Sequence, residues 1–181
     1  ETHLNKFKNK KINLLEIGIG GYDHAYVGGS SLRMWKSYFS KATIYALDIH
    51  DKKSVQEKRI KIYQGSQIDE AVLNDMADES KGFDIIVDDG SHVNEHVIET
   101  FKIMFKKLNN GGVYVVEDTQ TSYWPEFGGD SDNLQNPKTM INFFKNMPDS
   151  INNKEFMKPG YEQNYYDKNI VSIHFYHNMI F

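Results

Sequence analysis

Residues 11–31 have the sequence KINLLEIGIGGYDHAYVGGSS, in which a short apolar run passes directly into a glycine-rich stretch. The run at 11–18 is typical of a buried strand that ends at a turn. The glycines at 18, 20 and 21 let the backbone approach a ligand without a Cβ in the way. This stretch therefore predicts a strand that opens onto a binding site.

The same pattern of a strand followed by a helix continues along the chain. Further strands are predicted at 43–48, 60–64, 83–89, 113–118, 170–176 and 179–181, and helices at 32–39, 69–78, 94–108 and 137–146. Strands that alternate with helices indicate a parallel sheet covered on both faces. We therefore predict a Rossmann-like α/β fold, with a mostly parallel, doubly wound sheet and a reversed C-terminal strand. Ligands of such sheets bind outside the carboxyl ends of the strands.

Composition narrows the classes of function. The 181 residues carry a net charge of -4, and 39% of them are apolar. The basic residues form no stripe, so we expect no nucleic-acid partner. No apolar run reaches the ~20 residues that span a bilayer, and there is no signal-peptide pattern, so we expect no membrane partner. The lack of cysteine excludes disulfides and Cys-ligated zinc, and we expect a cytoplasmic protein.

The two ends of the sequence suggest a part of a longer protein. The chain starts at Glu1 without a methionine and stops at Phe181 inside a predicted strand. We expect residues 1–181 to form a single domain, and we leave open whether it assembles into a homo-oligomer.

The glycine-rich turn favours one adenosine-containing cofactor over another. A dinucleotide fingerprint, G-x-G-x-x-G, would need glycine at position 23, where this chain has Asp23. Asp48 ends the second strand, and an acid there can accept hydrogen bonds from both ribose hydroxyls of NAD or of S-adenosylmethionine. Because the phosphate-binding pattern is missing, we predict S-adenosylmethionine, which has no phosphate.

The predicted cofactor contacts come from the strand ends and the first helix. Glu16 and Asp88 could meet the cofactor's ammonium group, and Ser31, at a helix N-terminus, its carboxylate. The full predicted set is Glu16, Gly18, Gly20, Ser31, Asp48, Ile49, Ser66, Gln67 and Asp88.

Carboxylates also follow the fourth and fifth strands, as Asp88-Asp89 and Glu117-Asp118. Neighbouring strands would bring these acids to one edge, where mutual repulsion calls for a cation. An all-oxygen set favours Mg²⁺ or Ca²⁺ over zinc. We predict Asp89, Glu117 and Asp118 as ligands, with the alternative that any one of them is an ordinary strand-end acid. Adjacent strand residues face opposite sides, so Asp88 and Asp89 should differ in role.

His92 is the candidate general base. It lies three residues beyond Asp89, on the turn into the next helix. A histidine near a metal-bound hydroxyl suits proton abstraction, so we predict His92 and Asp89 as the catalytic residues. The alternative is a surface histidine at the start of a helix.

Four segments together resemble the macrolide-sugar O-methyltransferases of the mycinamicin and tylosin pathways. They are 14–39 (LLEIGIGGYDHAYVGGSSLRMWKSYF), 44–51 (IYALDIHD), 83–94 (FDIIVDDGSHVN) and 111–129 (GGVYVVEDTQTSYWPEFGG). The resemblance implies a class I methyltransferase fold and dependence on S-adenosylmethionine and Mg²⁺. It also implies Asp89, Glu117 and Asp118 as metal ligands and His92 as the base.

The sequence thus predicts an S-adenosylmethionine-dependent O-methyltransferase domain that acts on a sugar hydroxyl of a small molecule. The acceptor would be a nucleotide sugar, such as one used in polysaccharide biosynthesis, or a glycosylated metabolite. Tyr123, Trp124 and Phe127 offer apolar surface for a sugar face, although core packing would explain them nearly as well. Two alternatives from other classes are a nicotinamide-dependent oxidoreductase and a non-catalytic cofactor-binding module of the same fold.

Overall fold

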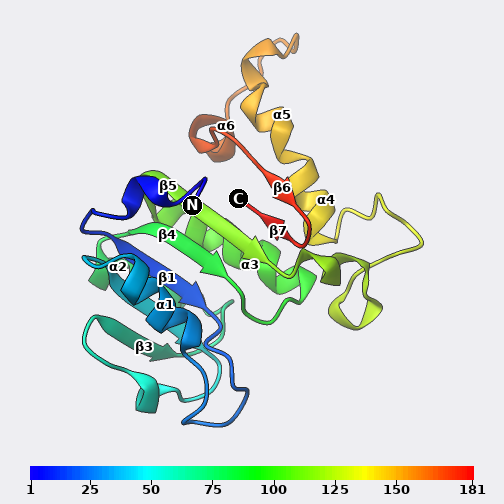
Figure 1. Cartoon of the computed structure of the whole chain (residues 1–181). Helices are drawn as coiled ribbons and strands as arrows, with labels where there is room; N and C mark the ends of the chain where they lie inside the picture. Colours follow the sequence, from blue (N-terminus) through cyan, green and yellow to red (C-terminus); the bar gives the residue numbers. More distant parts are fainter.

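A seven-stranded sheet with the strand order β3-β2-β1-β4-β5-β7-β6 runs through the computed structural model, which describes all residues, 1–181 (Figure 1). β1 to β5 are parallel, and β7 runs antiparallel to β5. This arrangement confirms the predicted mostly parallel sheet with a reversed C-terminal strand. The strands are β1 (Asn13–Ile17), β2 (Thr43–Asp48), β3 (Ile60–Gln64), β4 (Phe83–Asp88), β5 (Leu108–Glu117), β6 (Phe175–Tyr176) and β7 (Met179–Ile180).

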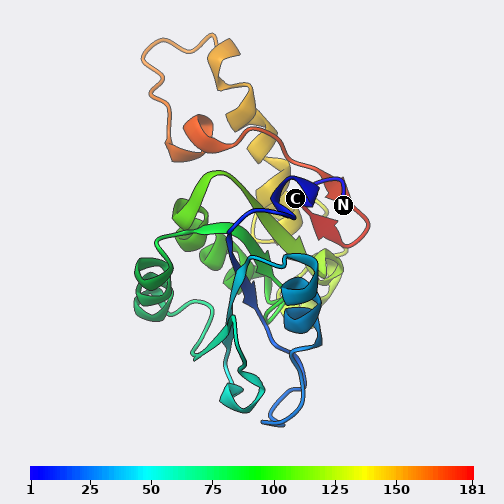
Figure 2. The same cartoon turned by 60° about the vertical axis from the view of Figure 1, so that its left-hand side comes forward.

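Helices cover both faces of the sheet (Figures 1 and 2). They are α1 (Ser30–Tyr38), α2 (Glu70–Ser80), α3 (Asn94–Met104), α4 (Met140–Lys145), α5 (Met147–Ile151) and α6 (Tyr165–Asn169). One core joins the sheet to α2, α3 and α4, and a second core joins the other face to α1 and the N-terminal segment. No helix combines the length and the apolar character that crossing a bilayer requires.

Alternation along the strands divides the side chains between these two cores. In β1, Leu14 packs in the core beside α1, and Leu15 packs in the core beneath α2 and α3. In β4, Ile85 and Ile86 are divided in the same way. This period of two continues to the strand ends, so consecutive functional residues there face different sides of the sheet.

Several predicted boundaries were wrong. The 3-10 turn Phe105–Lys107 follows α3, and β5 begins at Leu108 instead of 113. The Asn-Asn-Gly-Gly stretch lies within β5, because the β4–β5 register shifts between Phe83 and Ile85 and accommodates the extra residues. Residues 170–174 lie outside any strand, and only Phe175–Tyr176 form β6.

The helix starts were predicted with mixed success. Asp69, at the start of the predicted helix 69–78, caps α2, since its side chain accepts hydrogen bonds from the Ala71 and Val72 amides. α1 begins at Ser30 instead of the predicted 32, and Gly29 occupies its N-cap position. The Ser31 hydroxyl donates to Glu16 and does not cap the helix.

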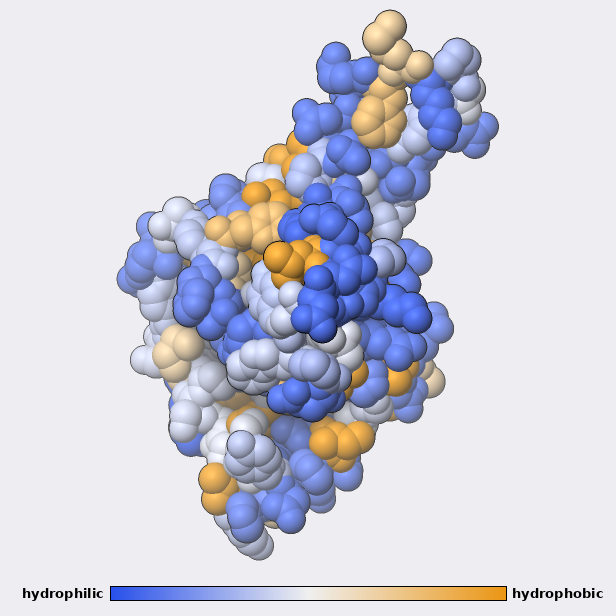
Figure 3. Space-filling model, turned by 90° about the vertical axis from the view of Figure 1, so that its right-hand side faces the viewer, coloured by the Kyte–Doolittle hydropathy of each residue, from blue (hydrophilic) through white to orange (hydrophobic).

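The segment from α5 to α6 projects beyond the sheet as an arm, which the sequence did not predict (Figures 1 and 3). A capping box at Asn164 and Asp167 starts α6. Asn153 ties the arm together by donating to the carbonyl of Asp167. On the face shown in Figure 3, hydrophobic residues occur as separate patches among hydrophilic ones. No predicted site residue lies on the arm.

Gly18 lets the turn after β1 touch the loop after β4. Its φ is +91°, and a Cβ at this position would lie 2.1 Å from the carbonyl oxygen of Asp89. The neighbouring Gly20 also has a positive φ, +73°, but no atom lies within 4 Å of a Cβ placed there. Of these two glycines, Gly18 alone therefore combines a positive φ with a close approach.

We expect Gly18→Ala to lower the free energy of unfolding by at least about 2 kcal/mol, because strain and a backbone clash add together. Gly20→Ala, the matched control, should cost only about 1 kcal/mol of conformational strain. Urea unfolding followed by circular dichroism measures both. Equal costs in the two variants would contradict the close approach at Gly18.

Candidate functional site

A pocket of about 230 Å³ opens at the carboxyl ends of β1, β2 and β3, where the cofactor was predicted. Its lining includes five predicted cofactor contacts: Gly18, Asp48, Ile49, Ser66 and Gln67. Gly90, Ser91 and His96 also line it, and the sequence analysis did not predict them as contacts. The hydroxyl of Ser91 lies 2.9 Å from Nδ1 of His96. The one sequence signal for His96 was its place in the first turn of the helix after β4.

Asp48 is already partly engaged by the backbone. One carboxylate oxygen accepts from the amide of Ile19 and the other from the amide of His50, each at 2.9 Å. These bonds fix the turns after β1 and β2. Because a carboxylate can accept about four hydrogen bonds, Asp48 keeps acceptor capacity for ribose hydroxyls.

Glu16 is buried on the α1 side of the sheet and does not line the pocket. The hydroxyl of Ser31 and the indole of Trp35 donate to its two oxygens. Burial raises the pKa of Glu16 to about 7 against the opposing effect of these bonds. Glu16 and Ser31 thus join β1 to α1. Gly20 also lies outside the pocket lining. The role of Glu16, Ser31 and Gly20 as cofactor contacts stays a prediction.

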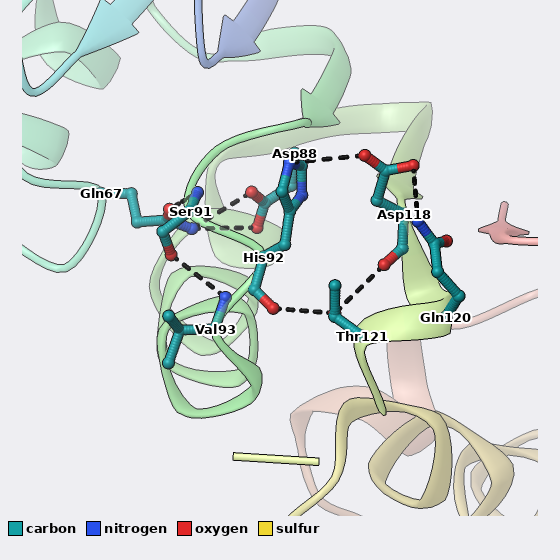
Figure 4. A network of polar contacts seen from close by, with 8 residues as sticks. All are labelled: Gln67, Asp88, Ser91, His92, Val93, Asp118, Gln120 and Thr121. Atoms are coloured by element: carbon teal, nitrogen blue, oxygen red, sulfur yellow. Dashed lines mark hydrogen bonds and ion pairs between the residues drawn. The ribbon is translucent and has the colours of Figure 1, made fainter. Parts of the chain in front are cut away.

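Asp88 lies on the opposite side of the sheet, beneath α3. It is almost fully buried, and burial raises its pKa to about 7. Gln67 donates to it at 3.1 Å, while the side-chain oxygen of Gln67 accepts from the Ser91 amide at 2.7 Å (Figure 4). Asp88 does not line the pocket, but its hydrogen bond holds the side chain of Gln67, which does.

Asp89, His92 and Asp118 form a cluster at the ends of β4 and β5. Ligand atoms of the three side chains lie within 4.8 Å of one another. Nε2 of His92 lies 3.4 Å from a carboxylate oxygen of Asp118 (Figure 4). Both residues have left-handed backbone conformations, with φ of 55° at His92 and 53° at Asp118. Such conformations are uncommon outside glycine and often occur at functional sites.

Glu117 lies beside this cluster without being one of the three residues whose atoms converge. Burial raises the pKa of Glu117, and the charges of Asp89 and Asp118 raise it further. Burial, followed by the charge of Asp118, raises the pKa of Asp89 to about 6. Three crowded carboxylates with one histidine suit a hard divalent cation. Coordination by Asp89, Glu117 and Asp118 and proton transfer by His92 stay predictions.

Aromatic side chains lie on the two short 3-10 helices that follow Asp118 and on the residue between them. The rings of Trp124 and Phe127 are 6.0 Å apart, and Tyr123 and Trp124 are 40% and 44% exposed. This exposure leaves both available to a ligand. A larger cavity, of about 620 Å³, lies along β5 and the C-terminal hairpin, and no predicted site residue lines it.

Comparison with known proteins identifies the family of the chain. Residues 16–161 match the family model described as Rhamnosyl O-methyltransferase/CmcI. The chain belongs to this family. The match confirms the resemblance inferred from the four sequence segments, and the family is one of methyltransferases, not of nicotinamide-dependent oxidoreductases.

Individual relatives give the same result. The chain is 43% identical to a demethylmacrocin O-methyltransferase of Streptomyces fradiae and 44% identical to a mycinamicin VI 2''-O-methyltransferase of Micromonospora griseorubida. Both alignments cover 100% of this chain and 46% of the relative, so the chain spans about half the length of these proteins.

A solved structure of the MycE methyltransferase shares the fold. That protein, in complex with Mg, SAH and mycinamycin VI, superposes with a TM-score of 0.94 at 44% identity. The match covers 99% of this chain and 46% of MycE. It confirms the class I methyltransferase fold predicted from the sequence.

The raised pKa of Glu16 makes stability depend on pH. Between the ordinary value of 4.5 and the folded value of about 7, the folded state binds more protons than the unfolded state. The free energy of unfolding should therefore fall by about 3 kcal/mol as pH rises through this window. Glu16→Gln should remove this part of the slope.

Denaturant unfolding at a series of pH values measures that slope. Glu70→Gln is the matched control, since Glu70 is an exposed residue in the first turn of α2. It should leave the slope as it is in the wild type. A Glu16→Gln variant that kept the wild-type slope would show that Glu16 does not titrate in this way.

Proposed function

We propose that this chain is the catalytic domain of a Mg²⁺-dependent enzyme that transfers a methyl group from S-adenosylmethionine to a sugar hydroxyl. One observation carries the proposal: the loop after β4 belongs to both candidate sites. Gly90 and Ser91 line the pocket, while Asp89 and His92, on either side of them, join the cluster with Asp118. A donor bound in the pocket and an acceptor held at the cluster would therefore meet across this loop.

The relatives support the class of acceptor. Their names describe O-methyltransferases that act on demethylmacrocin, on mycinamicin VI and on a rhamnosyl tetracenomycin. By analogy, the acceptor we propose is a sugar hydroxyl on a glycosylated small molecule, with a nucleotide sugar as the second candidate. A cytoplasmic location and a role in polysaccharide biosynthesis stay predictions.

Each residue has a definite part in the proposed reaction. When bound, S-adenosylmethionine supplies a methyl group on a sulfonium, and Mg²⁺ lowers the pKa of a hydroxyl beside it. Asp48 would accept from the ribose hydroxyls, and Asp89, Glu117 and Asp118 would hold the cation.

His92 would take the hydroxyl proton while the new carbon–oxygen bond forms. The carbon–sulfur bond breaks in the same step, and its electron pair stays on sulfur. The side chain of His92 is 24% exposed, so it can reach an acceptor from a partly desolvated position. Holding donor and acceptor in line could account for about 7–11 kcal/mol of the barrier reduction.

Titration with S-adenosylhomocysteine tests the cofactor assignment without knowledge of the acceptor. We expect one-to-one binding that weakens at least about tenfold in Asp48→Ala, because hydrogen bonds to a charged acceptor are lost. Asp51→Ala is the matched control, since Asp51 is exposed and lies outside the pocket. Calorimetry measures all three proteins, with thermal melting to confirm that each is folded. No binding by folded wild-type protein would overturn the proposed function.

Replacement of His92 tests the proposed base. We expect His92→Ala to lower the rate of methyl transfer by about 10²–10⁴-fold, the usual contribution of a general base. Its affinity for S-adenosylhomocysteine should stay within about threefold of the wild type, because His92 is not a pocket residue. Mass spectrometry of mycinamicin VI and a panel of nucleotide sugars would detect the added methyl group. His50→Ala is the control, and wild-type turnover in His92→Ala would refute the assignment.

A further inference from the structure

The side chain of Thr121 links the two loops that carry the cluster. Thr121 lies in the 3-10 helix η4 (Thr119–Tyr123), which directly follows Asp118. Its hydroxyl donates to the carbonyl of His92 at 2.8 Å, and the carbonyl of Asp118 lies 3.1 Å away (Figure 4). A hydroxyl has one proton to donate, so the shorter contact, to His92, is the main bond. This bond joins residues that are 29 positions apart in the sequence.

Thr121 is itself held rigidly. It is only 2% exposed, and its amide donates to the carbonyl of Asp118 at 3.2 Å. Its carbonyl accepts from the side chain of Asn94 and from the amide of Trp124, each at 3.1 Å. The hydroxyl therefore projects from a fixed backbone, and it connects that backbone to the loop after β4.

The two residues whose carbonyls lie near the Thr121 hydroxyl, His92 and Asp118, have strained backbones. His92 and Asp118 are both left-handed, a conformation that persists in non-glycine residues when the surrounding structure fixes it. The hydrogen bond from Thr121 holds the backbone carbonyl of His92. The side chain of the same residue, His92, lies 3.4 Å from the carboxylate of Asp118.

We propose that Thr121 is a positioning residue that sets the spacing of the loop after β4, which carries the proposed ligand Asp89 and the proposed base His92, relative to Asp118. Thr121 contacts neither cofactor nor substrate in this proposal and acts through the loop after β4. The inference rests on the proposed metal-dependent function. It predicts that the hydroxyl of Thr121 controls metal affinity and has little effect on cofactor affinity.

Valine has nearly the shape of threonine and lacks the hydroxyl, so Thr121→Val tests the link directly. The probe is Mn²⁺. Electron paramagnetic resonance measures its binding, because the signal of the free ion is lost when the ion binds. We expect Thr121→Val to bind Mn²⁺ about 10–100-fold more weakly, the usual effect of removing an interaction that orients metal ligands. Thr121→Ser keeps the hydroxyl and should stay within about threefold of the wild type.

Thr119→Val is the matched control within the same helix. Thr119 is also buried, at 4% exposed, but its hydroxyl makes no hydrogen bond to His92 or Asp118. Its Mn²⁺ affinity should stay within about threefold of the wild type. All variants should bind S-adenosylhomocysteine as the wild type does. Thr121→Ala, which removes the same hydroxyl, replaces the valine variant if melting shows that variant to be unfolded.

Two results would overturn this inference and leave the proposed function standing. One is wild-type Mn²⁺ affinity in folded Thr121→Val (or in Thr121→Ala, where it replaces the valine variant). The other is a loss of Mn²⁺ affinity in Thr119→Val equal to that in the Thr121 variant. Wild-type protein that binds S-adenosylhomocysteine but not Mn²⁺ would overturn the metal-dependent function, and this inference with it. Failure of the positioning role and failure of the proposed function therefore give different results.

Discussion

The close contact between the turn after β1 and the loop after β4 is the constraint on which the rest of the site depends. Gly18 has no side chain at a point where a Cβ would meet the backbone of Asp89. The amide of Gly18 donates to Leu47 and the amide of Asp89 donates to Ile17, at 2.8 and 2.9 Å. The ends of β1, β2 and β4 are thereby fixed to one another. Because the pocket uses the first two ends and the acidic cluster uses the third, this contact holds the two sites side by side.

Burial divides the acids of these strand ends into two groups. Glu16 and Asp88 are at most 2% exposed, and burial raises the pKa of each to about 7. Each is hydrogen-bonded to neighbouring side chains, Glu16 to Ser31 and Trp35. Asp89, Glu117 and Asp118 are partly exposed and lie close enough to repel one another. The first group can stay neutral and serve the fold, whereas a bound cation would relieve the repulsion within the second.

The sequence predicted the features that depend on local pattern. The period of two in the strands was sufficient to predict the sheet. The acids at the strand ends were sufficient to predict that Asp48 lies in the pocket and that Asp89 and Asp118 lie near each other. Features set by tertiary contacts could not be predicted in this way. The Ser31 hydroxyl turns to Glu16, and His96 reaches the pocket only because α3 lies against the strand ends. The arm between α5 and α6 was missed because its short helices lack a sustained apolar period.

The backbone and the charges around His92 and Asp118 bear on the alternative of a non-catalytic binding module. Left-handed backbone at His92 and Asp118 destabilises the fold by about 1–3 kcal/mol each. The crowding of Asp89, Glu117 and Asp118 is also unfavourable: burial first, and then the charges of Asp89 and Asp118, raise the pKa of Glu117. A module that only bound a cofactor would need the pocket at β1 to β3 and none of these features. Their presence beside the pocket, on a loop that the pocket shares, favours a chain in which the cluster takes part in a reaction.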